Sequence, residues 1–426
     1  MIKQHLRQAW TMMKQQKLFT SIYIAGTAIS IAMAMTIFVI LYIKLGPLYP
    51  EENRNKMVIA NDITLKDGED IYGTKLNGDI IERIKKESKY IKNATARESN
   101  EYKQSYITSD DGKKEITLVP GYVDSDFWKV FNFNFIKGRP FTKKEENSPV
   151  AVITTSLADK LYAGTNVVGR NIYIDTLQYS IIGVVESQHT YIANNLSGGD
   201  IFAPLHYSSY FNETNNSVVM GWQRLIMTTE TPQHCDSLKK EVKDIFSRII
   251  QEKSYGQFSN YELNLYNHWQ LSLQVFDNSG FFDAVIKYLY ILLAFLFIPA
   301  LNLCGLISTR MNSRLAEIGV RKVYGATGKQ IISQVLCENM LLTVIGAVIG
   351  FILTYIFVYR NNEWLITLFD NYIRSENIGV NAQIFFNPTI IGLVFIISIV
   401  LNIASALLPT VIALKKDIVQ SLYQRR

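Results

Sequence analysis

Cysteine, proline and charged residues are all scarce in this chain of 426 residues. Three cysteines, Cys235, Cys304 and Cys337, exclude a disulfide framework and any metal site with four cysteine ligands. Ten prolines and 24 glycines exclude a collagenous or low-complexity chain. Charged residues make up only 19%, below the roughly 25% of soluble proteins, so we looked for segments that avoid water.

Catalytic and nucleotide-binding motifs are also lacking. There is no G-x-S-x-G elbow, and the histidines within residues 44–283 have no second ligand at a metal-binding spacing such as H-x-x-x-H. These histidines are His189, His206, His234 and His268. The run from Gly325 to Lys329 resembles a nucleotide loop, but its first spacing is wrong and Gln330 follows the lysine. The sequence predicts a non-catalytic subunit that holds no metal or cofactor itself.

The formal net charge of +6 is too small to indicate a nucleic-acid surface. Residues 44–283 contain 27 basic and 31 acidic side chains, whereas the rest of the chain contains 16 basic and 6 acidic ones. The basic excess is therefore concentrated beside the apolar runs described next, and no nucleic-acid partner is expected.

Four long apolar runs predict transmembrane helices. The first, residues 22–43, has 22 residues without a charge, about 33 Å as a helix, which exceeds a hydrocarbon core of roughly 30 Å. The others cover residues 288–309, 339–359 and 384–414. A cleaved signal peptide is the alternative for the first run, but that run exceeds the usual 7–15 apolar residues and no A-x-A-like site follows. We expect an uncleaved anchor.

Lys and Arg between these runs predict the topology. Four basic and no acidic residues precede the first run, and five basic residues lie in the segment 310–338. Both termini and residues 310–338 are therefore expected in the cytoplasm, and residues 44–287 and 360–383 outside. Glu338 is expected at the cytoplasmic edge of the third span, where water reaches it.

The segment 44–287 is polar with short apolar runs and is expected to form an aqueous α/β domain. Val150 to Ile153 predicts a buried strand, and Ser156 to Asp159 has the pattern of a capping box that begins a helix ending at Tyr162. Residues 171–175 and 179–185 predict a hairpin.

The two flanks of this domain each predict a strand, a helix and a strand. The predicted segments are 57–63, 78–90 and 102–108 in the first flank, and 224–229, 236–250 and 261–266 in the second. We therefore expect one lobe from residues of about 50–115 and 218–270, and an inserted lobe from about 116–217. One continuous α/β domain is the alternative.

Residues 310–338, which we call the coupling segment, contain two helix signals. Asn312 to Tyr324 predicts a basic helix that ends at Gly325, a residue type that adopts the left-handed conformation easily. Thr327 and Gln330 predict a capping box from which a second helix continues into the third span. Such a segment could pass force from a cytoplasmic partner to the membrane. A solvated basic loop is the alternative.

The run Glu317-Ile318-Gly319-Val320-Arg321-Lys322-Val323-Tyr324-Gly325-Ala326 resembles the E-I-G-x-R-K-x-x-G-A motif of MacB/FtsX-type ABC transporter permeases. Residues 9–26, 122–185 and 405–422 resemble other parts of that family in the same order. The resemblance implies an α-helical membrane protein with four transmembrane helices and a large α/β extracytoplasmic domain between helices 1 and 2. It further implies an amphipathic helix over residues 1–21 and a cytoplasmic tail over residues 415–426.

The resemblance implies that the coupling segment docks on an ATPase. The coupling residues are then Glu317, Ile318, Gly319, Arg321, Lys322, Gly325 and Ala326. ATP and Mg would be bound by a separate ABC ATPase subunit. A second permease chain, identical or homologous, and a periplasmic or outer-membrane partner are further implied partners.

The function implied is that of a permease subunit for mechanotransmission or export, such as antibiotic or peptide export, at the bacterial inner membrane. The cargo stays open between macrolide-like drugs, peptides, lipoproteins and pure signalling. The alternative is an FtsX-like relay that activates an extracytoplasmic protein such as a cell-wall hydrolase. A membrane sensor without an ATPase is a third hypothesis.

Small residues recur every four positions on the first predicted span, at Gly26, Ser30 and Ala34. Such a stripe lets helices approach closely, so it predicts a face for dimerisation. Gly346 and Gly350 form a G-x-x-x-G pattern on the third span. Packing within one subunit is the alternative for both stripes.

Overall fold

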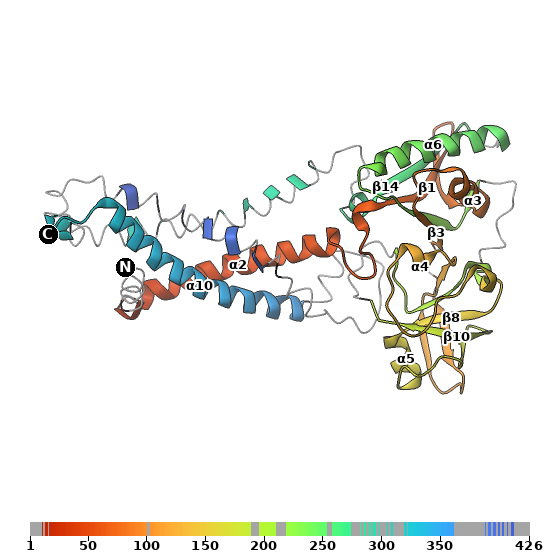
Figure 1. Ribbon diagram of the computed structural model, residues 1–426, viewed down its shortest axis with the longest axis horizontal. Coiled ribbons are helices and arrows are strands. Elements are labelled where there is room, and N and C mark those ends of the chain that lie inside the picture. Colours follow the sequence, from red (N-terminus) through yellow and green to blue (C-terminus); the bar gives the residue numbers. More distant parts are fainter. Residues whose placement is uncertain are drawn as a thin grey trace. The chain divides into compact units, whose positions relative to one another are not determined.

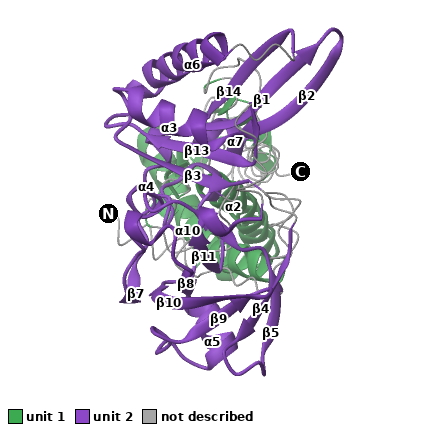
Figure 2. Ribbon diagram, turned by 90° about the vertical axis from the view of Figure 1, so that its right-hand side faces the viewer, with its two compact units in different colours: residues 1–42, 282–362, 381–426 green, residues 43–281, 363–380 purple. Residues whose placement is uncertain are grey.

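The computed structural model describes residues 17–99, 103–188, 196–209, 219–253, 258–273 and 323–361, with single residues and short runs between 11 and 15, 282 and 321, and 388 and 412. The chain forms two compact units, coloured separately in Figure 2. The first comprises residues 1–42, 282–362 and 381–426, and the second comprises residues 43–281 and 363–380.

Two described helices are long and apolar enough to cross a membrane. Helix α2 (Lys17–Leu45) has 29 residues and helix α10 (Gly328–Arg360) has 33 residues. They correspond to the first and third predicted spans. The segments predicted over 288–309 and 384–414, at both termini and over 360–383 lie mostly or wholly outside the described residues.

Helices α2 and α10 pack against each other through small residues (Figure 1). A Cβ atom added at Gly346 would lie 2.9 Å from Cβ of Thr27, and one added at Gly350 would lie 2.7 Å from the carbonyl oxygen of Ala28. Further along, the Thr354 hydroxyl donates to the carbonyl oxygen of Ala32 at 3.2 Å. The contacts advance in the same direction on both helices, so the helices run parallel. The predicted topology requires this of spans one and three.

The second unit is an α/β domain whose strands form one continuous sheet. Lobe 1 contains β1 (Met57–Asp67), β2 (Asp70–Leu76), β3 (Asn93–Glu98), β12 (Met220–Gly221), β13 (Gln223–Thr228), β14 (Asn260–Asn267), α3 (Gly78–Glu87) and α6 (His234–Lys253). Lobe 2 contains β4 (Ser105–Ser109), β5 (Glu115–Leu118), β7 (Phe135–Gly138), β8 (Val150–Thr154), β9 (Asn171–Ile174), β10 (Leu177–Val185), β11 (Ile201–Pro204) and α5 (Thr155–Tyr162). Between the two lobes lie β6 (Gly121–Val123) and α4 (Phe127–Val130). The domain also contains four short helices: η1 (Arg54–Lys56), η2 (Lys143–Glu145), η4 (Leu205–Tyr207) and α7 (His268–Ser272).

The lobes join at a narrow point of the sheet. The strand order is β12-β2-β1-β13-β3-β6-β11-β8-β10-β9-β4-β5, with β14 beside β1 and β7 beside β10. At the junction β3 and β6 share one residue pair, Arg97 with Val123, and β6 then pairs in parallel with β11. Separate apolar cores fill the two lobes, and an aromatic-rich core lies between them. The strands of both lobes thus belong to one sheet and to one compact unit, and the division into two lobes stays a prediction.

Lobe 1 buries one face of each of its helices. On α6 the predicted apolar face of Leu238, Val242, Ile245 and Ile249 is buried, as 3.6-residue periodicity requires. Helix α3 begins at Asn77, whose side chain accepts a hydrogen bond from the backbone N–H of Ile80 at 3.0 Å. The predicted strand–helix–strand order of the second flank is confirmed.

The predicted lobe boundary near residue 115 is wrong. The strand that completes the first flank is β3, which pairs with β13, and not the predicted strand over 102–108. That later segment forms β4, which pairs with β5 and β9 of lobe 2. β4 has the sequence SYITS, rich in residues that favour strands, whereas β3 has the sequence NATARE, with a single such residue. Intrinsic preference therefore pointed to the wrong segment, and pairing decided the lobe. Residues from about 103 onward belong to lobe 2.

Lobe 2 confirms the predicted buried strand and hairpin, with one correction. All five residues of β8 are buried, and β9 and β10 form the hairpin. Helix α5, however, is capped by Thr154 and not by Ser156, because the Thr154 hydroxyl accepts from the backbone N–H of Leu157 at 3.3 Å. The N–H of Ser156 donates instead to the Ser187 hydroxyl, which places Ser156 inside the helix.

Candidate functional site

The structure describes four of the seven predicted coupling residues. These are Gly319, Arg321, Gly325 and Ala326, whereas Glu317, Ile318 and Lys322 lie outside the described residues. Gly319 is buried and helical, and Arg321 is helical and half-buried.

The first helix of the coupling segment ends at Gly325, as predicted. Its φ of +90° lies in the left-handed region, and no atom lies within 4 Å of an added Cβ, so backbone conformation is what favours glycine here. The N–H of Ala326 closes the end by donating to the carbonyl oxygen of Arg321 at 2.9 Å.

The predicted capping box that begins α10 is present. The N–H of Thr327 donates to Oε1 of Gln330 at 2.9 Å, and the N–H of Gln330 donates to the Thr327 hydroxyl at 3.4 Å. Two N–H groups that a helix start leaves without partners are thus satisfied reciprocally. The turn between the two helices is short, because Gly325 to Thr327 alone separate Tyr324 from Gly328.

Arg321 connects the first helix to α10 through side chains. Its guanidinium donates to Oε1 of Gln334, and Nε2 of Gln334 donates to Oε1 of Glu338 at 3.1 Å. Glu338 is only 2% exposed, so the expectation that water reaches it is wrong. Gln334 lies one helical turn before Glu338 and contacts its carboxylate. The three residues tie the short helix to the first turns of the long one.

Apolar side chains project from the same short helix. Tyr324 is 87% exposed and Val323 is 66% exposed, and Val320 is also exposed. An exposed apolar group of this size beside basic residues is typical of a surface that contacts another protein. The basic residues of this segment are evident from the sequence, whereas the exposure of these apolar side chains is evident only from the structure.

The small-residue stripe of α2 is largely covered within the chain. Ala34 is buried in a cluster that includes Ala347 and Phe351 of α10, and Ser30 is buried with its hydroxyl bonded to the carbonyl oxygen of Gly26 at 2.6 Å. Among the described residues, no atom lies within 4 Å of a Cβ added at Gly26. The dimer face through Gly26, Ser30 and Ala34 stays a prediction, and Gly26 is the position with space for a partner.

The described part of the chain contains two free cysteines, Cys235 and the half-buried Cys337. Cys235 is buried and free, and burial raises the pKa of its thiol. Among the described residues, no three His, Cys, Asp or Glu side chains are grouped in a way that could hold a metal ion.

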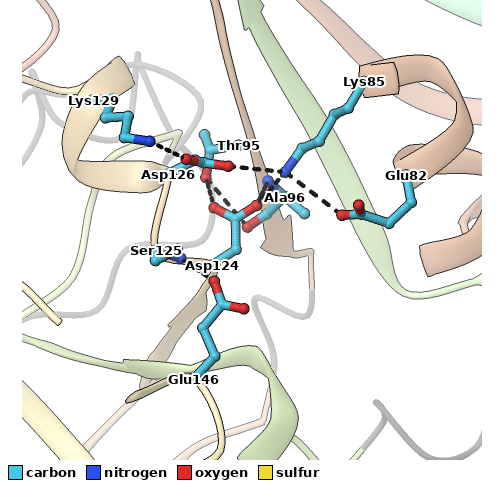
Figure 3. A network of polar contacts seen from close by, with 9 residues as sticks. All are labelled: Glu82, Lys85, Thr95, Ala96, Asp124, Ser125, Asp126, Lys129 and Glu146. Atoms are coloured by element: carbon cyan, nitrogen blue, oxygen red, sulfur yellow. Dashed lines mark hydrogen bonds and ion pairs between the residues drawn. The ribbon is translucent and has the colours of Figure 1, made fainter. Parts of the chain in front are cut away.

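The junction between the lobes contains a polar network that the sequence analysis missed (Figure 3). Asp124, just after β6, accepts from Nζ of Lys85 on α3 at 2.6 Å and from the N–H of Ala96 on β3 at 2.8 Å. The Thr95 hydroxyl donates to the same carboxylate. On the other side, the N–H of Ser125 donates to Glu146 at 2.8 Å. Charged side chains thus reinforce the point where the sheet is narrowest.

Family comparisons agree with this architecture. A model of the MacB-like periplasmic core domain matches residues 20–245, more than half of the chain, and a model of the FtsX-like permease C-terminal region matches residues 279–418. The chain belongs to the MacB/FtsX family of ABC permeases. The recognition from the motif at residues 317–326 is therefore confirmed.

Individual MacB/FtsX relatives are distant in sequence. The macrolide export ATP-binding/permease protein MacB of Salmonella paratyphi A is 22% identical over 82% of this chain and 51% of its own length. The uncharacterized ABC transporter permease YknZ of Bacillus subtilis is 22% identical over 61% of each chain. A crystal structure of the periplasmic region of MacB from Actinobacillus actinomycetemcomitans is similar with a TM-score of 0.38 and 14% identity, over 54% of this chain and 98% of that one.

The chain spans one third to one half of the MacB proteins that it matches. The covered share is 32% for MacB of Haemophilus ducreyi and 51% for the Salmonella protein. The activity, substrates and partners of those longer proteins are therefore only proposals for this MacB/FtsX-type chain.

Proposed function

We propose that this chain is the permease subunit of an ABC-type exporter or mechanotransmission complex. ATP hydrolysis by a separate cytoplasmic ATPase would move the coupling segment, and the movement would reach the extracytoplasmic domain through the membrane helices. The chain itself would be non-catalytic, with ATP and Mg bound by the ATPase.

One observation carries this proposal: an exposed apolar surface is attached rigidly to a membrane-spanning helix. Val323 and Tyr324 project from the short helix, and Arg321, Gln334 and the Thr327 capping box fix that helix to α10. A partner that binds and displaces this surface would displace α10 by a similar amount, because the connection between them is short and hydrogen-bonded.

The family and the names of relatives support an ATPase partner. MacB proteins are named as combined ATP-binding and permease proteins, and this chain aligns with part of their length. No Walker A motif occurs in its sequence. We propose that the ATP-binding function is supplied by another polypeptide.

The proposed setting is the bacterial inner membrane, with both termini and the coupling segment in the cytoplasm. The α/β domain would then lie in the periplasm, where a periplasmic or outer-membrane partner could bind it. The working unit would contain a second permease chain, identical or homologous.

The test is purification of the full chain in mild detergent with identification of the chains that accompany it. We expect an ABC ATPase, and we expect Arg321→Ala and Tyr324→Ser to lower the permease-dependent ATPase activity about tenfold. A loss of that size corresponds to an interface residue worth about 1.4 kcal/mol. Lys329→Ala, a matched change at an exposed basic residue in the first turn of α10, should retain full activity.

Full activity in both coupling variants would refute the role of the coupling segment. Purification without an ATPase would favour the sensor hypothesis. The FtsX-like relay predicts that the full chain also binds a cell-wall hydrolase, whereas an exporter predicts an outer-membrane channel partner. The accompanying chains therefore separate the proposed function from its alternative.

A further inference from the structure

Both ends of the α/β domain meet at one buried carboxylate, that of Glu51. Residues 43–54 lead into the domain from α2, and α7 (His268–Ser272) is the last described element before residue 282. Oε2 of Glu51 accepts from Nε of Arg54 at 2.8 Å and lies 3.2 Å from Nε2 of His268. The Glu51 side chain is 0% exposed and that of His268 is 1% exposed. No function described above uses these groups.

Arg54 connects Glu51 to the end of α2. Its Nη1 donates to the carbonyl oxygen of Ile43, in the last turn of α2, at 2.7 Å, and to that of Gly46 at 3.0 Å. The last carbonyls of a helix have no partners within the helix and carry the negative end of its dipole, so a guanidinium binds them strongly. A displacement of the helix end must therefore displace Arg54.

Glu51 also binds a loop that lies more than 140 residues later in the sequence. Its Oε1 accepts from both the N–H of Ser197, at 3.1 Å, and the Ser197 hydroxyl, at 2.7 Å. The carbonyl oxygen of Ser197 accepts from Nε2 of Gln188 at 2.7 Å. The N–H, hydroxyl and carbonyl groups of Ser197 are thus all hydrogen-bonded, which fixes the position of the loop 196–198.

Arg97 holds the same loop from lobe 1. It lies on β3 at the single pair that joins β3 to β6, and its guanidinium donates to the carbonyl oxygens of Leu196, at 3.1 Å, and Gly198. After the loop, and just before β11, Asp200 accepts from the Thr154 hydroxyl of lobe 2 at 2.9 Å. The loop is therefore the meeting point of the helix end, lobe 1 and lobe 2.

The links are strong because they are buried and charged. Arg54, Glu51, Ser197 and Arg97 are all buried, so water is not available to replace a broken bond. Separating a buried ion pair leaves an uncompensated charge, whereas moving the pair as a unit does not. A displacement at one end therefore costs less free energy when the bonded groups move together than when a bond between them breaks.

We propose that Arg54, Glu51, the loop 196–198 and Arg97 form a transmission path from the end of α2 to the junction of the two lobes, and that they act as positioning residues for lobe movement. The proposal rests on the proposed function only in taking ATP hydrolysis as the source of the movement. The path itself can be tested without an ATPase.

The first experiment is hydrogen exchange of the full chain in nanodiscs without nucleotide. Arg54→Lys keeps the charge but loses the fork that bridges Glu51 and two carbonyls. We expect exchange to rise about tenfold or more, not only in residues 43–54 but also in the remote segment 196–204. Arg170→Lys changes an exposed ion pair with Asp110 in the same domain and should leave both segments unchanged.

Combining Arg54→Lys with Arg97→Lys completes a double-mutant cycle. The path predicts that the effects on exchange in residues 196–204 are clearly not additive, because both residues hold one loop. A rise confined to residues 43–54, or additive effects, would overturn the path. Where Arg54→Lys does not fold, Ser197→Ala removes one donor to Glu51 and gives the same test in a milder form.

The second experiment adds the ATPase. Spin labels at the exposed positions Lys240 on α6 and Lys160 on α5 report the distance between lobes. We expect ATP to change this distance, and we expect Glu51→Gln to reduce the change at least twofold while ATPase activity is retained. An unchanged shift in Glu51→Gln would overturn the path. The absence of any ATP-driven shift in the unmodified chain would instead refute the proposed function, and the exchange result would stand.

Discussion

At the residue scale, the notable feature is a group of charges buried in a chain that has few charges. Burial alone would raise the pKa of Glu51, but Arg54, His268 and Ser197 together lower it to about 2. Burial lowers the pKa of His268 by more than its bond to Glu51 raises it. The imidazole is therefore neutral and the carboxylate ionised at neutral pH. Ser272 lies 3.2 Å from Nδ1 of His268 and fixes the other side of the ring.

These pKa values predict that the domain loses stability in acid. Both groups bind protons more readily in the unfolded chain than in the folded one, so protonation favours unfolding. The contribution of His268 is complete above its ordinary pKa of 6.5 and is lost as the pH falls below it. The contribution of Glu51 is lost between about pH 4.5 and pH 2. Thermal unfolding of the full chain across pH 2 to 8 measures both contributions.

His268→Gln provides the control, because glutamine can keep a hydrogen bond to Glu51 without titrating. We expect its unfolding midpoint to vary less between pH 7.5 and pH 5.5 than that of the unmodified chain. An equal dependence on pH in both chains would show that His268 is not the titrating group.

At the element scale, α2 and α10 form a parallel pair because glycine permits close approach. The contact between Gly350 and Ala28 leaves no space for a side chain, whereas no atom of the described part of the chain lies within 4 Å of a Cβ added at Gly26. The same spacing of small residues in sequence therefore has two different structural meanings. The predicted pattern could not distinguish them, since it contains no information on which helix lies opposite.

Gly350→Leu should destabilise the helix pair, because the new side chain meets the backbone of α2. We expect a loss of about 1–3 kcal/mol, which is typical of overpacking, measured as the thermal unfolding midpoint in detergent. Gly26→Leu makes the same change at the position without such a contact among the described residues and should leave the midpoint close to that of the unmodified chain. Equal losses in both variants would contradict the packing described.

At the scale of the whole domain, two lobes share one sheet and are held at a narrow junction. Strands β3 and β6 share a single residue pair, and the Asp124 carboxylate adds hydrogen bonds to Lys85 and to the backbone of Ala96 at this point. The stability of the junction therefore depends on side chains more than on the ladder of the sheet.

Asp124→Asn should weaken the junction because it leaves Lys85 without its closest counter-charge. The Lys85 and Asp124 side chains are 15% and 13% exposed, and losing a hydrogen bond between charged groups costs about 1.5–3 kcal/mol, which corresponds to roughly 3–12 °C in the unfolding midpoint of a domain of this size. Hydrogen exchange should rise in β3 and β6 first. Arg83→Gln, which removes exposed ion pairs on the same helix, should leave the midpoint unchanged. Equal midpoints for Asp124→Asn and the unmodified chain would show that the junction does not need this carboxylate.

The sequence alone determined the features that depend on neighbouring residues. The apolar runs at residues 22–43 and 339–359, the Gly325 terminus and the Thr327 capping box are local patterns, and each is present in the structure. The family motif in residues 317–326 is equally local. Periodicity and capping involve residues at most a few positions apart, so they can be read without knowing the fold.

Only the tertiary structure decided which distant residues meet. Glu51 contacts Ser197 and His268, which are 146 and 217 positions away, and the lobe to which β4 belongs depends on its pairing with β9. The same strand-forming residues could have paired in either lobe, and a single charged residue carries no periodic signal. Pairing is chosen by the free energy of the whole sheet and its cores, so the buried path and the lobe boundary emerged only from the folded chain.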